Sequence, residues 1–515
     1  MSPVNSKMPD QQLVDARPSP VEVDRKPATL AAVVSTAGLA AVLVVRHLGT
    51  KPLWLDETVS VSVARRPLIG LLSVLPHHDA NAGVYYLLLH GWLHLGQSAA
   101  WTRSPSAISF VGTTALAAWV ASRWRGAWFG FACGLLVATN RFLLFYGQEA
   151  RPYALAVLLA VASTAALFWR NEKPAPRTYI AATVALLYVD LFAVLFVVAQ
   201  AGAVVAIHRH RGMPVPRMLV RCWAIIAAVT APLALLMITN QRSQISWLTR
   251  PTLRYLEQTI TAMTNGWLGL TVMGGLALVA LATVRLTTRG RMVPTGRLVV
   301  GALLASFVIP PFSLWLISQV VPSFIDRYVI CSTVAIIGLA AVGLDVLRKR
   351  AGSVVALTIL ALLAAVGVSR VATLEGQAFK YENPPVVVSF IESQARPGDA
   401  VGFAGGGLRT VIDAHLPQGA PFPVDIALAP GGKASRQHDV YAREVNSATL
   451  ALRLTHVQRL WLVTDPTNRR YPPFGPFAPL RPTVTEAFEP TTIGAFPGID
   501  VTLYTRRALA SQSRG

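Results

Sequence analysis

The stretch Leu53-Trp54-Leu55-Asp56-Glu57-Thr58 follows the first strongly apolar segment of the chain, residues 27–45. That segment is long and apolar enough to span a membrane, so Asp56 and Glu57 are expected at a membrane edge. Charged groups in such a place are costly unless they face water or a charged partner, which favours a functional site. The alternative is that both carboxylates are polar residues in the first turn of a surface helix, where acidic residues are common.

The composition places the chain among membrane proteins. It has 515 residues, of which 53% are hydrophobic and only 14% are charged. Soluble domains carry about 25% charged residues, and this chain also contains repeated long apolar runs, so we expect a polytopic α-helical membrane protein. The net charge of +21 fits basic cytoplasmic loops that face anionic lipid headgroups. Because no basic stripe interleaved with aromatic residues stands out, binding to nucleic acid is not expected.

The cysteines and the N-terminal tail suggest no chemistry. Cys133, Cys222 and Cys331 all fall in apolar runs and are far apart in sequence. We interpret them as small core residues, without a disulfide framework or a metal-binding spacing. Residues 1–26 are polar and contain prolines, which predicts a disordered cytoplasmic tail rather than a cleaved signal peptide.

Apolar segments divided by basic loops predict the membrane topology. The predicted spans are 27–45, 104–122, 127–145, 153–169, two short spans within 177–207, 222–239, 266–284, 298–321, 328–347 and 352–368. Lys and Arg gather in the loops 123–125, 170–177, 208–221, 285–297 and 348–350. If these loops are cytoplasmic, the N-terminus is inside and the transmembrane domain, residues 27–368, has about eleven spans.

The first outer loop then covers residues 46–103. Its run 83–95 also looks like a span, but a crossing there would turn every later basic loop outward. We therefore expect an interfacial or re-entrant helix at 83–95, with a second such helix at 55–64.

The composition changes after about residue 369, and everything beyond is expected outside. Helices are predicted at 384–395 and 443–454, with strands at 400–404, 460–463 and 501–504. Residues 369–515 thus read as a small extracytoplasmic α/β domain. Three glycines at 405–407 lack the full spacing of a phosphate-binding loop, so a flexible turn is predicted there.

Four groups of polar residues share the outer face in this topology: Asp56-Glu57, His77-His78-Asp79, Gln148-Glu149-Ala150-Arg151-Pro152-Tyr153, and Asp326-Arg327-Tyr328. Each group has a structural interpretation as well. Glu149 and Arg151 could pair with charges inside the bundle, and Arg327 could anchor a span at the interface. His77 and His78 are adjacent, and adjacent residues rarely ligate one metal ion, so no metal is expected. The convergence of all four groups on one face favours a functional site.

These motifs resemble a family of polytopic C-type glycosyltransferases that use polyprenyl-phosphate sugars, in the branch of protein mannosyltransferases and aminoarabinose transferases. The resemblance rests on the Asp-Glu pair after the first span, on residues 146–153, on 326–328 and on 92–106. It covers roughly residues 28–350. The chain departs from the family at Ala80-Asn81-Ala82-Gly83, where the family often has prolines. A composition rich in Ala, Val and Arg suggests an actinobacterial type.

The resemblance implies an inverting transfer of a sugar from a polyprenyl monophosphate to a cell-envelope acceptor, without a cofactor. It implies that Asp56 is the base, that Glu57 supports it as a second catalytic carboxylate, and that Arg327 and Arg151 hold the phosphate. Orienting roles toward donor sugar or phosphate fall to Glu149, Gln148, His77, His78, Tyr328 and Tyr153. Mannose is the favoured sugar, with arabinose or another pentose as the alternative. The acceptor would be a glycolipid, a polysaccharide or a protein at the cell membrane.

Two other classes of function compete with this one. A transporter or flippase of lipid-linked substrates would also need many spans, but such proteins typically show internal repeats and helices broken at the midplane. No repeat stands out in this sequence. A scaffolding protein that presents the C-terminal domain is the third possibility.

Labelling with a membrane-impermeant thiol reagent tests the topology. In a variant without the native cysteines, a single cysteine at residue 410 is expected to react in intact cells. A cysteine at residue 290 is expected to react only after permeabilisation, because the charge bias places the two positions on opposite sides. Labelling at 290 but not at 410 in intact cells would overturn the shared outer face of the four polar groups.

Overall fold

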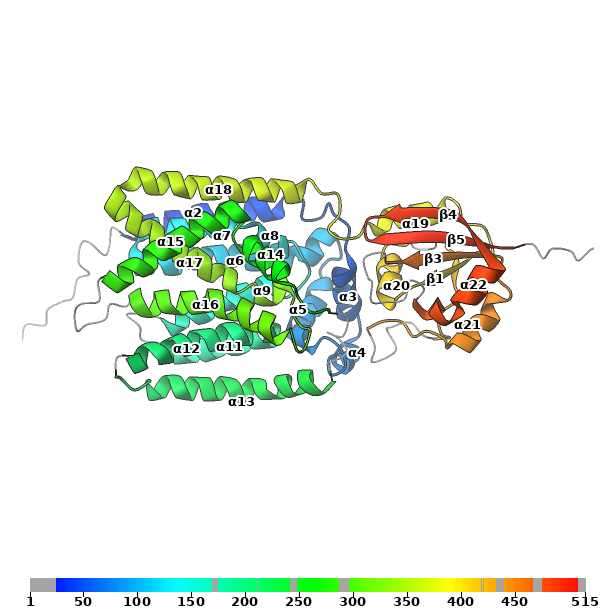
Figure 1. The fold of residues 1–515 in the computed structure, drawn as a ribbon, viewed down its shortest axis with the longest axis horizontal. Coiled ribbons are helices and arrows are strands. Elements are labelled where there is room, and N and C mark those ends of the chain that lie inside the picture. Colours follow the sequence, from blue (N-terminus) through cyan, green and yellow to red (C-terminus); the bar gives the residue numbers. More distant parts are fainter. Residues whose placement is uncertain are drawn as a thin grey trace, which may run out of the picture.

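The computed structural model describes residues 25–168, 175–210, 212–240, 248–286, 296–417, 419, 421–431, 440–465 and 475–507. The predicted tail at 1–26 and the basic loops at 170–177 and 285–297 lie wholly or largely outside these residues. A bundle of long helices carries a smaller sheet-containing unit at one end, and short helices lie between the two (Figure 1).

The bundle is built from helices whose apolar residues face one another and the surroundings. They are α2 (Arg25–Val45), α6 (Ala99–Arg125), α7 (Ala127–Ala138), α8 (Arg141–Gly147), α9 (Tyr153–Leu167), α11 (Pro176–Val189), α12 (Val194–His210), α13 (Arg217–Asn240), α14 (Leu253–Met263), α15 (Trp267–Leu286), α16 (Gly296–Ile317), α17 (Ser332–Ala351) and α18 (Ser353–Glu375). Each predicted span falls on one of these helices or on a bent pair of them.

Only some of these helices are long and apolar enough to cross a membrane on their own. Within the described residues, six helices are long and apolar enough to cross a membrane, or up to eight if each bent pair is one span. The other predicted spans fall on α9 and α11, which are short, and on α17, which carries Asp345 and ends in basic residues. The chain is therefore a polytopic helical membrane protein, and the number of eleven spans stays a prediction.

The basic helix ends lie together at the end of the bundle far from the sheet unit. Arg125 at the end of α6 lies 3.2 Å from Asp345 of α17, which also pairs with Arg348 and Lys349. The connection between α12 and α13, which follows Arg209, is at the same end (Figure 1). The predicted grouping of the loops 123–125, 208–221 and 348–350 agrees with this arrangement.

A break between α7 and α8 shapes the opposite end of the bundle. The two helices meet at an angle of 64°. Asn140 stabilises the break, because its Oδ1 accepts from the N–H of Leu143 and its Nδ2 donates to the carbonyl of Met263. The α8 helix then ends at Gly147, so that residues 148–152 turn across the end of the bundle before α9 begins.

Short helices cover this end of the bundle: α3 (Leu55–Ala64), α4 (Leu68–Val74), the 3-10 turn η1 (Ala80–Ala82) and α5 (Gly83–Leu93). They share a small core that includes Val63, Leu71 and Tyr86. The expected helices at 55–64 and 83–95 are both present, and they lie between the bundle and the sheet unit (Figure 1). This placement fits interfacial helices in an outer loop.

The sheet unit has a five-stranded sheet in the order β2-β1-β3-β5-β4, in which β1 pairs in parallel with β2 and β3, and β5 pairs antiparallel with β3 and β4. Its elements are α19 (Pro384–Glu392), β1 (Ala400–Phe403), α20 (Gly406–Asp413), β2 (Val424–Asp425), α21 (Ser447–Leu454), β3 (Arg459–Thr464), η7 (Gly475–Leu480), α22 (Arg481–Ala487), β4 (Phe488–Phe496) and β5 (Ile499–Arg506). The strands expected at 400–404, 460–463 and 501–504 fall on β1, β3 and β5.

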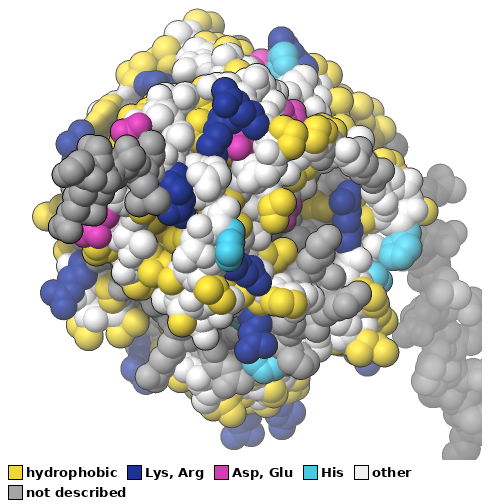
Figure 2. All heavy atoms as spheres, turned by 90° about the vertical axis from the view of Figure 1, so that its right-hand side faces the viewer, with side chains coloured by type: hydrophobic (Ala, Val, Ile, Leu, Met, Phe, Trp, Pro, Cys, Tyr) yellow, Lys and Arg dark blue, Asp and Glu magenta, His cyan; other side chains and the backbone are white. Residues whose placement is uncertain are grey.

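Successive side chains of a strand point to opposite faces of the sheet, and helices cover both faces here. Val401, Trp461 and Val463 belong to the core beneath α19 and α20, whereas Leu460 and Leu462 belong to the core beneath α21 and α22. Seen from its far end, the sheet unit shows basic, acidic and hydrophobic side chains scattered among other atoms (Figure 2). The bundle helices expose large apolar side chains such as Leu30, Leu278 and Val354, as lipid-facing helices do.

The predicted flexible turn at 405–407 is wrong in part, because α20 begins at Gly406. A Cβ atom on Gly407 would lie 3.0 Å from a methyl carbon of Leu55, so the glycine lets α20 approach α3 closely. The missing side chain thus serves the packing of the sheet unit on the interfacial helices.

Candidate active site

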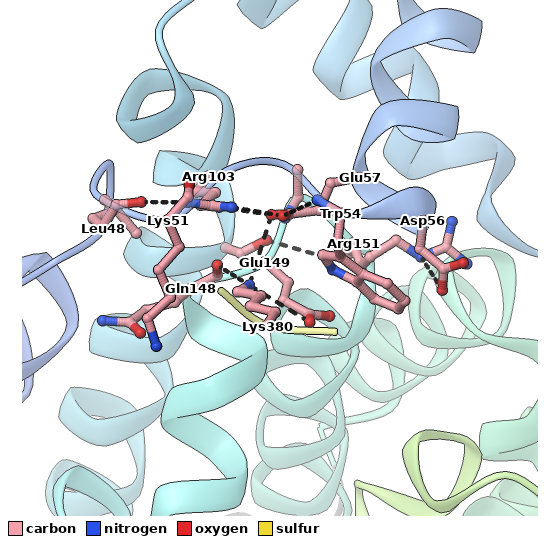
Figure 3. A network of polar contacts seen from close by, with 12 residues as sticks. Leu48, Lys51, Trp54, Asp56, Glu57, Arg103, Gln148, Glu149, Arg151 and Lys380 are labelled. Carbon is pink, nitrogen blue, oxygen red and sulfur yellow. Dashed lines mark hydrogen bonds and ion pairs between the residues drawn. The ribbon is translucent and has the colours of Figure 1, made fainter. Parts of the chain in front are cut away.

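The α3 helix places its two adjacent carboxylates in different surroundings. Successive helix residues point about 100° apart. Figure 3 shows Glu57 beside Arg103 and Asp56 turned toward Arg151. The Asp56 side chain is 22% exposed and the Glu57 side chain is 0% exposed.

Glu57 is enclosed by a buried ion pair. Its carboxylate accepts two hydrogen bonds of 2.7 Å from the guanidinium of Arg103, a residue of α6. It also accepts from the backbone N–H of Ala150 at 3.0 Å. Arg103 donates its remaining hydrogens to the carbonyls of Leu48, Lys51 and Pro52. The pair therefore joins α3, α6, the loop before α3 and the turn before α9.

A second carboxylate and a lysine lie against this pair. Lys380, from the segment after α18, donates to the carbonyl of Gln148 at 2.6 Å and lies 3.5 Å from Glu149 and 3.7 Å from Glu57. Burial raises the pKa of Glu149 to about 7, although the Lys380 ammonium opposes the rise. Burial also acts to raise the pKa of Glu57, but the Lys380 and Arg103 cations outweigh it and lower that pKa to about 2.

Asp56 faces a different pair of cations. Its Oδ2 lies 3.1 Å from Nη2 of Arg327, which follows Asp326 in the 3-10 turn η5 (Asp326–Val329). The same oxygen lies 3.9 Å from Nε of Arg151. Arg151 also lies 3.5 Å from Asp79, while its Nη1 donates to Tyr86 Oη at 3.2 Å. Two carboxylates, Asp56 and Asp79, and two guanidinium groups thus meet at the end of the bundle that faces the sheet unit.

Aromatic rings support these cations. The guanidinium carbons of Arg151 and Arg327 each lie 5.8 Å from the ring centre of Tyr153, at the start of α9. Tyr328 stacks on Phe192 with ring centres 4.0 Å apart and planes 5° apart. Cation–π contacts hold arginine side chains in place without consuming their hydrogen-bond donors.

Several donors and acceptors here are buried without a hydrogen bond. Among the described residues these include Nε of Arg151, Nε of Arg327, and Oδ2 of Asp56. A buried polar group without a partner costs roughly 1–3 kcal/mol, so a ligand that satisfies it binds favourably. Two guanidinium edges are suited to a phosphate, because their planar donor sets match its oxygens.

The predicted site residues fall into four sets. Asp56, Arg151, Arg327, Tyr153 and Tyr328 converge on one site, whereas Glu57 and Glu149 are enclosed behind it. The Gln148 amide donates to the carbonyls of Val44 and Arg46, which fastens the end of α2.

His77 and His78 lie in the segment between α4 and η1. His77 is exposed, and its Nδ1 lies 3.2 Å from the Ser73 carbonyl on α4. From the His77-His78-Asp79 group, it is Asp79 that reaches Arg151. Asp79 adopts a left-handed backbone conformation, with φ at 57°, which turns the chain into η1.

Lys380 and Arg103 were not predicted as site residues. The charged pair Lys380 and Glu382 after the last span, and a lone arginine at the start of a predicted span, were the available signals. Neither signal identifies a partner, because both residues contact carboxylates far away in sequence.

Comparison with solved structures finds the same fold at low sequence identity. ArnT from Cupriavidus metallidurans in the apo state aligns with a TM-score of 0.59 and 12% identity, covering 92% of this chain and 98% of that chain. The structure of the same ArnT bound to undecaprenyl phosphate gives a TM-score of 0.54 and 11% identity, with 92% and 97% covered. No protein-family model and no curated protein matches the sequence.

These likenesses confirm the fold that the sequence motifs predict. The chain has the C-type glycosyltransferase fold, in which it resembles ArnT over nearly the whole of both chains. The likeness concerns the fold. The actinobacterial type and the role of each site residue stay predictions.

The division between the two carboxylates of α3 can be tested by stability. Glu57→Gln leaves Arg103 and Lys380 with one fewer buried counter-charge, and losing one partner of a buried pair costs about 3–5 kcal/mol. Asp56→Asn removes a carboxylate that is partly exposed to solvent, so it is expected to cost less than Glu57→Gln. Thermal melting of the two purified variants measures the difference. Equal melting temperatures would contradict the enclosing role of Glu57.

Proposed function

We propose that the chain is a membrane glycosyltransferase that moves a sugar from a polyprenyl monophosphate donor to an acceptor hydroxyl. The observation that carries the proposal is the meeting of Asp56 with Arg151 and Arg327. The two arginines keep buried donors without a hydrogen bond. A base beside a phosphate-binding pair is what this reaction requires.

The donor phosphate would occupy the space between the two guanidinium groups. There it replaces Asp56 as the main partner of Arg327, whose Nη2 lies 3.1 Å from Asp56 Oδ2. The structure of similar fold, ArnT, has been solved with undecaprenyl phosphate, which supports a lipid phosphate as the ligand class. The polyprenyl chain would lie along the apolar exterior of the bundle, whose helices expose large hydrophobic side chains.

The proposed reaction is a single displacement. Asp56 takes the proton of the acceptor hydroxyl while the acceptor oxygen bonds to the anomeric carbon. The bond between that carbon and the phosphate oxygen breaks on the opposite side, so the configuration inverts. The leaving polyprenyl phosphate carries the developing negative charge, which Arg151 and Arg327 stabilise. A positioned base of this kind contributes about 10²–10⁴-fold to the rate.

The remaining residues set the geometry and the surroundings of the site. Glu57 and Glu149 act from behind the site by holding α3 and the turn before α9, and Gln148 fastens α2. Tyr153 and Tyr328 would border the sugar, with His77 and His78 nearer the rim. We propose mannose as the sugar, or arabinose or another pentose, and a glycolipid, polysaccharide or protein acceptor. The site would face the extracytoplasmic side of the cell membrane.

Asp56→Asn keeps the shape of the side chain but cannot take a proton. Transfer is expected to fall about 10²–10⁴-fold with donor binding nearly intact, whereas Glu57→Gln is expected to lower transfer less in the protein that remains folded. Single-turnover transfer, measured on protein checked by gel filtration and melting, tests both. Near wild-type transfer by Asp56→Asn would remove the base from this proposal and make Glu57 or Glu149 the next candidate.

Arg327→Lys keeps the positive charge and loses the planar fork. Donor binding is expected to weaken by roughly tenfold while the protein stays folded, because a lysine binds phosphate as a point charge. The donor KM and a direct binding measurement with polyprenyl phosphate report this change. Unchanged donor KM and turnover would leave Arg327 as an interfacial anchor.

A further inference from the structure

Three consecutive residues of the segment between α18 and the sheet unit contact the start of α3. Lys380 lies against Glu57 and Glu149. The ring of Tyr381 packs on Trp54, with centres 4.3 Å apart. Glu382 Oε2 accepts from the backbone N–H of Leu55 at 3.3 Å, at the first turn of α3. This segment, residues 380–382, therefore touches both residues that precede Asp56.

The sheet unit holds the same turn from a second direction. Gly407 at the start of α20 lies against the Leu55 side chain, and α20 packs along α3. The first turn of α3 is thus held by the segment 380–382 and by α20, both of which belong to the chain after the last predicted span. Asp56 sits in that turn, one residue after Leu55.

When Glu149 is ionised, above about pH 7, the charges inside the enclosed cluster balance only if Lys380 is present. Glu57 and Glu149 supply two negative charges, and Arg103 and Lys380 supply two positive charges. The side chains of all four are at most 3% exposed. Removing one cation from such a cluster leaves an unbalanced buried charge, which burial makes unfavourable.

We propose that Lys380 is a positioning residue, which couples the docking of the sheet unit to the placement of Asp56. When the segment 380–382 is seated, Lys380 neutralises Glu149 and holds the Gln148 carbonyl, so that the turn 148–151 and the first turn of α3 keep their spacing. Arg151 on that turn and Asp56 on α3 then lie within 3.9 Å of each other. The expected effect of Lys380 on transfer rests on the proposed function. A second readout, the stability of the protein, is independent of that function.

The second readout is the pH dependence of stability. The Glu149 pKa, raised by burial to about 7, means that the folded protein binds this proton more tightly than the unfolded chain does. Stability from this group is therefore full below about pH 4.5 and is lost as the pH rises through about 7. Charged and titratable groups that act on Glu149 are Lys380, Tyr381, Glu57, Asp56, Arg103, Arg327, Tyr85 and Tyr146. Losing the Lys380 cation raises the Glu149 pKa further, by about 1–3 units.

The experiment compares four variants of the full-length protein in detergent: Lys380→Met, Lys380→Arg, the double variant Lys380→Met with Glu149→Gln, and Lys51→Met. The double variant restores charge balance without the lysine. Lys51 is the matched control, because it is also a buried lysine at this end of the bundle, but its Nζ donates to the Leu374 carbonyl. Melting temperature is followed from pH 5 to pH 9, and turnover is measured at a saturating donor concentration.

In Lys380→Met, the fall of melting temperature with pH is expected to extend at least about one pH unit higher than in the wild type. Turnover is expected to drop about 10²-fold, as for a misplacement of roughly 1 Å, with little change in donor KM. The double variant is expected to recover the wild-type melting profile above pH 7. Its turnover is expected to be at least about tenfold higher than that of Lys380→Met. Lys380→Arg is expected to stay near the wild type, and Lys51→Met to keep the wild-type shape of the pH profile.

Two results would overturn the inference. One is a Lys380→Met melting profile parallel to that of the wild type; the other is a double variant no better than the single one. If the wild type transfers no sugar from any donor, the proposed function fails, and the melting profiles still decide whether Lys380 balances this cluster.

Discussion

The buried ion pair between Glu57 and Arg103 is the contact on which the rest of the site depends. Its two hydrogen bonds of 2.7 Å lie where water does not reach. The same arginine holds three carbonyls of the loop before α3, and the same glutamate holds the N–H of Ala150. Breaking such a pair is far more costly than never having formed it, so the position of α3 is fixed once the pair closes. Because Asp56 is adjacent to Glu57 on α3, the ion pair also fixes the position of Asp56.

Burial separates the roles of the acidic residues at this end of the bundle. Glu57 and Glu149 are buried, and they lie against the buried cations Arg103 and Lys380. Asp56 is partly exposed, and its partners Arg151 and Arg327 retain buried donors without hydrogen bonds. Because these two arginines have donors that Asp56 does not use, an anionic ligand can bind them and take the place of Asp56 as their partner. Neighbouring residues of one helix thereby serve the framework and the proposed chemistry separately.

Local patterns in the sequence predicted much of this arrangement, but they could not predict contacts between segments that are distant in sequence. Apolar runs predicted the helices, alternation predicted β1, β3 and β5, and the motifs around Asp56, Arg151 and Arg327 predicted residues that do converge. The role of Lys380 could not be predicted, because its partners lie on α3 and before α9, hundreds of residues earlier. The family resemblance implied orienting roles for His77 and His78 and none for Asp79, although the left-handed turn at Asp79 brings the aspartate to Arg151.

The account is tested most directly by the fate of a labelled donor. Purified protein would be incubated with polyprenyl monophosphates that carry radiolabelled mannose, arabinose or another pentose, together with membrane extract as the source of acceptor. The account predicts that label from one donor moves to an acceptor with inversion at the anomeric carbon, and that free polyprenyl phosphate is released in equal amount. The contradicting result is a protein in liposomes that moves the intact donor across the bilayer while every sugar stays on its lipid.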